Sequence, residues 1–205
     1  MSEPVSAVST QPEASSDYCT AAMYGRNNTT GSLIIITAGH CVYDLASNTT
    51  WYNGANLVGQ QYSWIFGPGG DLGEIRVIAN DSGSRNRVMR STPSDWVNIG
   101  YEKPISQQVI GTSVCRSSAV LPNWNCGTIG ATDQTLLVCS QDGANCRNVS
   151  HLWRMSFTSS PGASGGPTLY GSTIFGVVSA KNPSYTWYVP TEYMTFADVC
   201  LTTEC

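Results

Sequence analysis

Two short segments of the chain combine residue types that could carry out acyl transfer. Thr37-Ala-Gly-His-Cys41 follows the apolar run 33–36, so a strand ending there would present His40 at its rim. Pro161-Gly-Ala-Ser-Gly-Gly-Pro167 surrounds Ser164 with small residues, whose bare backbone N–H groups could stabilise the negative oxygen of a tetrahedral intermediate. Alone, each segment has a structural interpretation: a histidine beside a structural cysteine, or a glycine-rich hairpin loop. Together they indicate a serine nucleophile with a histidine base.

A third segment would supply the carboxylate that holds the imidazole in one tautomer and stabilises its protonated form. Our candidate is Asp71, which opens the strand-like segment Gly70-Asp-Leu-Gly-Glu-Ile-Arg-Val77 after a glycine-rich turn. The resulting order is histidine, aspartate, serine, as in chymotrypsin and unlike subtilisin or the α/β-hydrolases. Asp95, which opens another alternating apolar run, is the main competitor.

The elements that must position these residues are short strands separated by Gly, Asn, Pro and Ser clusters. No stretch keeps a 3.6-residue apolar period, and the β-branched and aromatic residues concentrate in seven segments. These are residues 33–37, 73–78, 109–114, 135–138, 153–157, 174–179 and 187–189. Short helices are expected after His40 and over residues 191–199, and the polar stretch 81–104 is expected to be a long connection.

Size and charge narrow the function class. The chain has 205 residues, enough for one all-β domain or two small packed barrels. Only 12% of the residues are charged and the net charge is -4, so no basic field exists to bind nucleic acid. No apolar run approaches the roughly 18 residues needed to span a bilayer. We expect a soluble protein without nucleic-acid or membrane partners.

Eight cysteines without a Cys-x-x-Cys pair, in a chain with only two histidines, support zinc poorly. Four disulfides in an oxidising compartment are the economical interpretation, and Asn-x-Ser/Thr sequons are compatible with a secreted, extracellular protein. No signal peptide is visible at the beginning of the sequence. Residues 1–17 are rich in Ser, Pro, Glu and Ala and are expected to form a flexible tail.

At this point the sequence resembles the chymotrypsin-like (trypsin-fold) serine peptidases, and within them the bacterial streptogrisin and α-lytic protease branch. Besides the histidine and serine motifs, Phe66-Gly-Pro-Gly-Gly-Asp71 with Arg76 looks like the streptogrisin aspartate segment. Val114-Cys-Arg-Ser-Ser118 and Cys126-Gly-Thr-Ile129 resemble a streptogrisin hairpin. Cys41-Val-Tyr-Asp44 is also similar to the glutamyl endopeptidase branch, so the subfamily stays open.

The resemblance implies an all-β fold of two packed antiparallel six-stranded Greek-key barrels, with a short C-terminal helix and the active site between the barrels. The first barrel would span residues 18–100 and carry His40 and Asp71. The second would span residues 101–205 and carry Ser164. By resemblance Cys19 pairs with Cys41, and Cys115 with Cys126. Nearest-neighbour pairing adds Cys139 with Cys146 and Cys200 with Cys205, although eight cysteines allow 105 connectivities.

The backbone N–H groups of Gly162 and Ser164 are the candidate oxyanion donors. By resemblance, one wall of the substrate pocket comes from residues 158–160, the other from residues 179–181, and Thr186 lies near the base. The predicted substrate contacts are Thr158, Ser159, Pro161, Ser179, Ala180, Lys181 and Thr186.

Substrate preference stays open between two classes. No acidic residue occupies the pocket positions, so a trypsin-like preference has no carboxylate to support it. Lys181 with the hydroxyl side chains could favour an acidic substrate residue, although Val178 stands where glutamyl endopeptidases have a histidine. The other class, which the pocket residues favour, is an apolar or aromatic substrate residue.

Two residues depart from the family pattern. Ala163 precedes the nucleophile where the family usually has an aspartate in a buried ion pair that supports the oxyanion loop, so something else must support that turn here. Ser160 stands where streptogrisins have a cysteine of the pocket disulfide.

The sequence thus predicts a secreted, monomeric serine endopeptidase that acts on peptides or proteins and needs neither cofactor nor metal. An inactive homologue that serves as a binding module is the alternative. Ester hydrolysis would be a side reaction of the same site.

Overall fold

The computed structural model describes residues 9–12, 18–43, 45–46, 48–78, 84–91, 94–120, 124–140, 143–202 and 205. Its regular structure is nearly all β-strand, which confirms the predicted all-β class. Within these residues the helices are α1 (Gly39–Val42) and the 3-10 turns η1 (Ile105–Gln107) and η2 (Thr191–Tyr193). None of the helices described is long and apolar enough to cross a membrane.

The first sheet is antiparallel and has the strand order β17-β3-β4-β7-β6-β5-β1-β2. It contains β1 (Ser9–Pro12), β2 (Cys19–Thr20), β3 (Met23–Asn27), β4 (Leu33–Thr37), β5 (Thr50–Asn53), β6 (Asn56–Gly67), β7 (Gly70–Val77) and β17 (Ala197–Val199). The last of these comes from the opposite end of the chain, so the final strand completes the sheet of the first half.

The second sheet has the order β10-β15-β14-β11-β12-β13-β16, and β15 pairs in addition with β16. It contains β10 (Tyr101–Glu102), β11 (Ser113–Ser117), β12 (Trp124–Cys139), β13 (Cys146–Met155), β14 (Pro167–Tyr170), β15 (Thr173–Lys181) and β16 (Thr186–Pro190). The extra pairing closes six of these strands into a ring, the expected barrel size, with β10 attached outside it.

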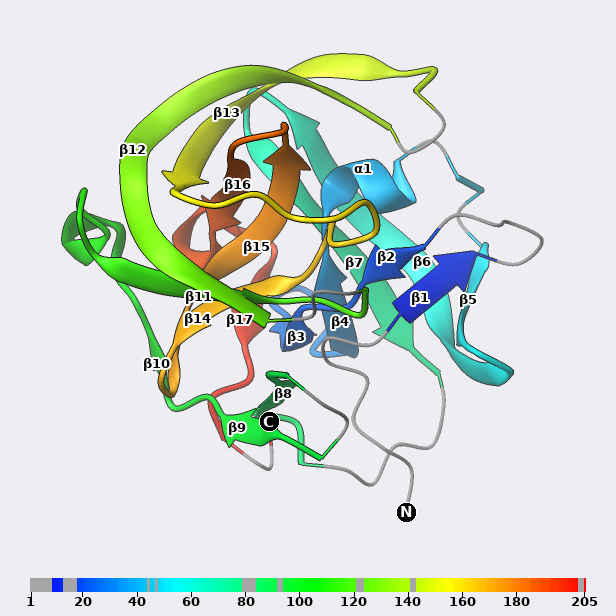
Figure 1. Cartoon of the computed structure of the whole chain (residues 1–205). Coiled ribbons are helices and arrows are strands. Elements are labelled where there is room, and N and C mark those ends of the chain that lie inside the picture. Colours follow the sequence, from blue (N-terminus) through cyan, green and yellow to red (C-terminus); the bar gives the residue numbers. More distant parts are fainter. Residues whose placement is uncertain are drawn as a thin grey trace.

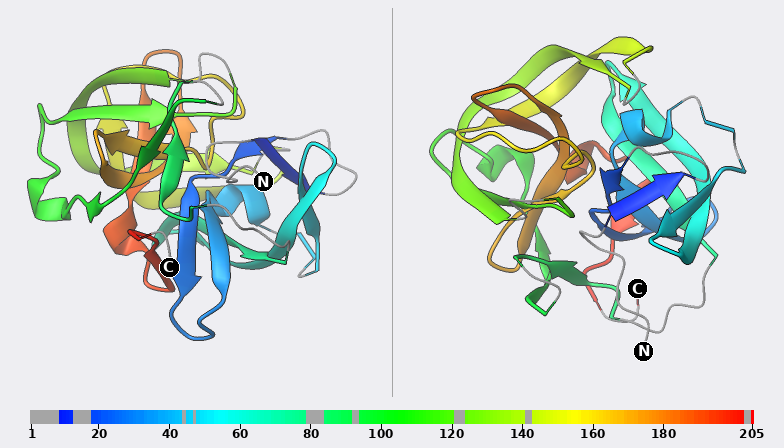
Figure 2. Two further views of the ribbon diagram at one scale, coloured as in Figure 1. Left: turned by 90° about the horizontal axis from the view of Figure 1, so that it is seen from below. Right: turned by 45° about the vertical axis from the view of Figure 1, so that its right-hand side comes forward.

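The two sheets lie side by side in every view (Figures 1 and 2). The long strand β12 arches around β13, β15 and β16, whereas the strands of residues 19–77 lie on the other side with α1 at the boundary (Figure 1). A small hairpin of β8 (Arg87–Met89) and β9 (Trp96–Asn98) lies within the predicted connection.

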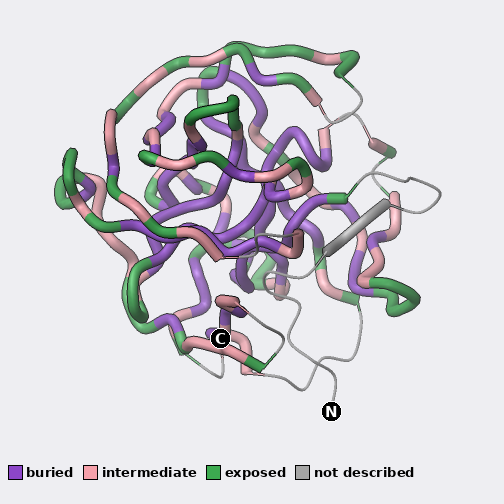
Figure 3. Tube along the Cα trace, viewed as in Figure 1, coloured by how far each residue is buried: buried purple, intermediate pink, exposed green. Residues whose placement is uncertain are grey.

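The core spans both halves of the chain (Figure 3). One cluster of buried side chains joins Ile34, Ile36 and Leu72 of the first sheet with Leu169 and Val177 of the second. In the first sheet, β4 is an uninterrupted run of Leu, Ile and Thr whose last four residues are buried. This suits a strand between two paired neighbours with both faces covered.

Several expected boundaries differ from the structure. Residues 191–199 form the single turn η2 and then β17 instead of a helix, because Ala197 and Val199 are buried against β3. Of the expected strand 109–114, only the end belongs to β11. Within the expected tail 1–17, Ser9–Pro12 forms β1, which pairs with β2 and β5; the rest of the tail lies outside the described residues.

Candidate active site

The helix α1 places His40 at the boundary between the two sheets. It begins directly after β4 and contacts β6 and β7 closely, which only a glycine at position 39 allows. A Cβ atom on Gly39 would lie 2.0 Å from the carbonyl oxygen of Ile65. The glycine of the histidine motif is therefore needed for packing, and His40 is left only 6% exposed.

A tight hairpin places Asp71 beside this histidine. β6 and β7 pair through Gly67 and Gly70, both with positive φ, so that β7 enters with Asp71 as its second residue. Asp71 is fully buried. Its carboxylate accepts three hydrogen bonds: from the backbone N–H of His40 (2.7 Å), from the His40 Nδ1 (2.7 Å) and from the Ser179 hydroxyl (2.5 Å).

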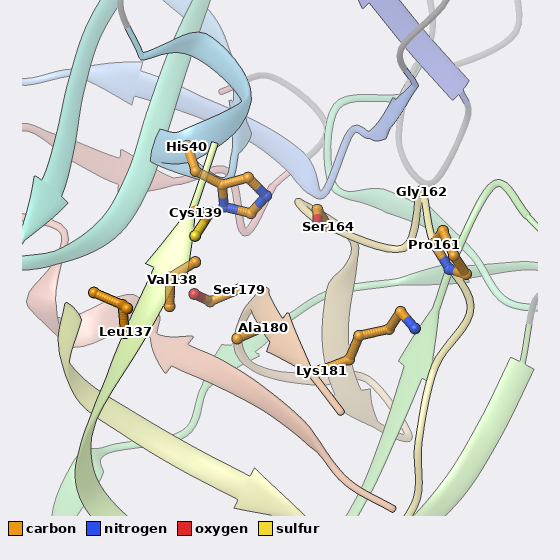
Figure 4. A pocket seen from close by; sticks show the side chains of 10 residues that line it. All are labelled: His40, Leu137, Val138, Cys139, Pro161, Gly162, Ser164, Ser179, Ala180 and Lys181. Carbon is orange, nitrogen blue, oxygen red and sulfur yellow. The ribbon is translucent and has the colours of Figure 1, made fainter. Parts of the chain in front are cut away.

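These contacts determine the tautomer of His40. A carboxylate can only accept, so Nδ1 carries the hydrogen of that bond and Nε2 keeps its lone pair. The ring points towards Ser164 in the pocket (Figure 4). In the part of the chain that the structure describes, no hydrogen bond joins the imidazole to the Ser164 hydroxyl; such bonds are often long in ligand-free sites.

Asp95, the competing candidate, has other partners. Its carboxylate accepts hydrogen bonds from Arg90 Nε (3.0 Å) and Nη2 (2.5 Å) and from the Ser91 hydroxyl (2.6 Å). The hydrogen bond from Ser91, followed by those from Arg90, lowers the pKa of Asp95. Asp95 therefore forms an ion pair with Arg90 at the surface, on the β8–β9 hairpin. The carboxylate that binds His40 is that of Asp71.

Ser164 lies on a turn between β13 and β14 with Gly162 (φ 85°) and Gly165 (φ 83°) in conformations that favour glycine. A Cβ on Gly165 would lie 2.1 Å from Thr37 Oγ1 and 2.3 Å from the Thr20 carbonyl oxygen. The N–H groups of Ala163 and Gly165 donate to Ser160 and Val178. Among the described residues, the N–H groups of Gly162 and Ser164 have no acceptor.

A cavity of about 280 Å³ lies between the two sheets at this point. It is lined by the predicted residues His40, Gly162, Ser164, Pro161, Ser179, Ala180 and Lys181, together with Leu137, Val138 and Cys139 (Figure 4). The last three come from the end of β12 and were missed by the sequence analysis. The one signal in the sequence is the expected pairing of Cys139 with Cys146, and it does not place this segment at the site.

The remaining predicted pocket residues do not line this cavity. The Thr158 hydroxyl donates to the carbonyl oxygen of Asn182 (2.6 Å). Ser159 and Thr186 are buried, with hydroxyl groups that have no hydrogen-bond partner among the described residues.

The four disulfides join the expected pairs, Cys19–Cys41, Cys115–Cys126, Cys139–Cys146 and Cys200–Cys205. Among the described residues, one cluster has side chains of metal-ligand type, Cys19, His40 and Cys41. Its two cysteines form a disulfide with each other, so neither offers a thiolate to a metal ion.

A second carboxylate, Glu74, is fully buried three residues beyond Asp71 on β7. Asn27 donates to both of its oxygens, at 2.9 and 3.2 Å. Burial raises the pKa of Glu74, and the hydrogen bond from Asn27 offsets part of this effect. Because the Asn27 side chain is buried in this contact, the first sequon of the chain offers no accessible amide in the folded protein.

Comparison with known proteins gives a consistent structural result. No family model and no curated protein sequence matches the chain. Among solved structures, a Nocardiopsis protease (NAPase) is 26% identical, with a TM-score of 0.75 over 94% of this chain and 95% of its own. Thermobifida fusca protease A is 25% identical, with a TM-score of 0.72 over 95% and 98%. A glutamic acid specific serine protease that uses a histidine triad in substrate binding is 22% identical, with a TM-score of 0.73 over 92% and 94%.

Proposed function

We propose that this chain, which has the chymotrypsin-like double-barrel fold of bacterial serine proteases, is a serine endopeptidase. The observation that carries the proposal is the buried Asp71 carboxylate bound to His40 Nδ1 at 2.7 Å, with Ser164 in the cavity that His40 lines. Two of the proposed catalytic residues, His40 and Ser164, line this cavity from separate parts of the chain, and Asp71 contacts the His40 ring from the interior.

The mechanism follows from the roles of these groups. Ser164 attacks the scissile carbonyl while His40 Nε2 accepts its proton and later gives it to the leaving amine. Asp71 keeps the ring oriented and stabilises the imidazolium. The free N–H groups of Gly162 and Ser164 bind the oxyanion, and water then hydrolyses the acyl-enzyme.

The cavity suits two substrate classes. Leu137, Val138, Pro161 and Ala180 give it an apolar lining that would cover an apolar or aromatic side chain. Lys181 brings a positive charge to the same lining, which would attract an acidic side chain. We infer an apolar or aromatic preference, with the acidic preference as the competing case.

A peptide series that differs only in Phe, Leu, Glu or Gln before the scissile bond separates these classes. Preferred cleavage after Phe or Leu supports the apolar class. If cleavage after Glu dominates, and Lys181→Gln lowers the Glu-to-Gln selectivity about five-fold, the acidic class is correct.

The four disulfides are consistent with an extracellular site of action, and we propose that the enzyme is secreted and acts on peptide or protein substrates. We also propose that the enzyme acts as a monomer.

The experiment that tests the proposal is covalent labelling with an organophosphonate or a sulfonyl fluoride, followed by mass mapping, in wild type and in Ser164→Ala. We expect one adduct per chain on Ser164 of the wild type and no adduct in the variant, together with loss of peptide hydrolysis. A folded wild-type chain that takes up no label at Ser164 contradicts the proposal and supports the alternative, an inactive homologue that binds peptides. Comparison of amide and ester turnover identifies an esterase.

A further inference from the structure

The loop that carries Ser164 lacks the acidic residue that the family places before the nucleophile. Ala163 occupies that position and is 1% exposed, so it packs in the interior without forming an ion pair. The loop nevertheless needs fixed peptide groups, because donors of an oxyanion site are effective only when they are held in place before the reaction.

Thr20 holds two of the three carbonyl groups of this loop. Its hydroxyl donates to the Gly162 carbonyl oxygen at 2.8 Å, and its backbone N–H donates to the Ser164 carbonyl oxygen at 2.7 Å. The carbonyl between them, that of Ala163, accepts from Gly166 at 3.0 Å. Three successive peptide groups are thereby anchored, which leaves the Ser164 N–H directed away from these contacts.

Thr20 is itself held from three sides. It is fully buried, its carbonyl oxygen accepts from the Thr37 hydroxyl at 3.0 Å, and its own hydroxyl accepts from the Ala119 N–H at 3.2 Å. Its neighbour Cys19 is bonded to Cys41, which follows His40. One short path therefore connects the histidine and the serine loop.

We propose that Thr20 is the positioning residue of the oxyanion loop in this chain and replaces the missing acidic residue before the nucleophile. The inference rests on the proposed peptidase function. Thr20 acts through the peptide groups of residues 162–165 and contacts no reacting atom.

The test is Thr20→Val, which keeps the β-branched shape and removes the hydroxyl, compared with Thr20→Ser, which keeps the hydroxyl. For a peptide amide substrate we expect kcat to fall about 10- to 100-fold in Thr20→Val with KM nearly unchanged, since an oxyanion interaction acts mainly in the transition state. Affinity for a peptide boronic acid, which forms a tetrahedral adduct, should fall by a similar factor. Thr20→Ser should restore most of both.

Thr168→Val is the matched control. Thr168 is also fully buried and lies four residues beyond Ser164, but its hydroxyl has no hydrogen-bond partner among the described residues. Its removal should leave kcat within about two-fold of wild type.

The outcomes separate the two proposals. If the wild type takes up no label on Ser164, the peptidase function itself fails, and the role of Thr20 fails with it. If the wild type is active and folded Thr20→Val has an unchanged kcat, only the role of Thr20 is wrong. Hydrogen exchange of the wild type needs no variant. The Thr20 amide, which donates to the Ser164 carbonyl oxygen, should be protected without ligand, and exchange at the rate of an open loop overturns the inference.

Discussion

The buried Asp71 side chain binds residues from both halves of the chain. Its two oxygens accept from the backbone and the ring of His40 and from Ser179, which belongs to the other sheet. A buried carboxylate needs such partners, since an unpaired charge in the interior is costly. The contact from Ser179 also joins the two halves of the chain at the proposed catalytic histidine.

Replacing this carboxylate should reduce catalysis while leaving the fold intact. In Asp71→Asn the amide keeps the shape but can present an N–H to the ring, which favours the wrong imidazole tautomer. We expect kcat for a peptide amide to fall about 10⁴-fold. Steady-state kinetics near pH 7 would measure it.

The matched control is Asp95→Asn, which removes the other candidate carboxylate and its surface ion pair with Arg90. Activity should stay near the wild-type value. A large loss in Asp95→Asn, with little loss in Asp71→Asn, would reverse the assignment.

Glu74 should make stability depend on pH. Burial raises its pKa in the folded protein, so between pH 4.5 and that higher value the folded state binds more protons than the unfolded chain. Stability from this group is therefore greatest below pH 4.5 and falls as the pH rises through the folded-state pKa.

Glu74→Gln removes this titration. Urea unfolding of both proteins from pH 4 to pH 8 should show the variant gaining stability relative to wild type as the pH rises. Parallel curves for the two proteins would show that Glu74 keeps its ordinary pKa.

The sequence identified the chemistry of individual residues better than their surroundings. His40, Asp71 and Ser164 stand in motifs of small residues whose spacing is visible. The structure brings His40 and Ser164 to one cavity, and the fully buried Asp71 binds His40 Nδ1. Thr20 could not be found in this way. It is an ordinary threonine in a two-residue strand, and its contacts depend on a loop more than 140 positions away.

At the scale of elements, the hairpin of β12 and β13 extends from the second sheet to the cavity and to Tyr43. Its tip, closed by Cys139–Cys146, brings Leu137 to the cavity, and Arg147 of β13 bonds to the Tyr43 hydroxyl and lies 4.8 Å from the centre of that ring. The hairpin thus belongs to the second sheet but contacts the residues next to His40.

Truncating the Leu137 side chain on this hairpin should weaken substrate binding without changing kcat. Leu137 is 67% exposed and lines the cavity, so a bound peptide would cover it. We expect Leu137→Ala to raise KM about three- to ten-fold for an apolar peptide, with kcat unchanged. Leu57→Ala, at an exposed leucine of β6 that is not part of the cavity lining, is the control and should change neither value.

Elements were predictable where local pattern and tertiary packing agree. β4 is predicted with its bounds, because its apolar run is continuous. Residues 191–199 looked helical, since polar and apolar residues alternate there in a roughly helical way, but pairing with β3 makes β17 a strand. β6 was missed because its mixture of Gly, Gln and Ser hides a 12-residue strand that only its partners specify.

At the scale of the molecule, the disulfides should contribute unequally to stability. Cys19–Cys41 closes a loop with a sequence separation of 22, and Cys200–Cys205 one of 5. Loop entropy predicts a loss of about 3 kcal/mol for Cys19→Ala/Cys41→Ala and about 2 kcal/mol for Cys200→Ala/Cys205→Ala. Urea unfolding measures both, and a larger loss for the short loop would contradict the entropic explanation.

The pairing of β17 with β3 also sets the order of events during biosynthesis. The ribosome makes β3 early and β17 more than 160 residues later, so the first sheet cannot be completed before β17 has been synthesised. Contacts between such distant segments form slowly. Until β17 has been made, β3 has one unpaired edge, which leaves time for a chaperone to engage the nascent chain before the first sheet is complete.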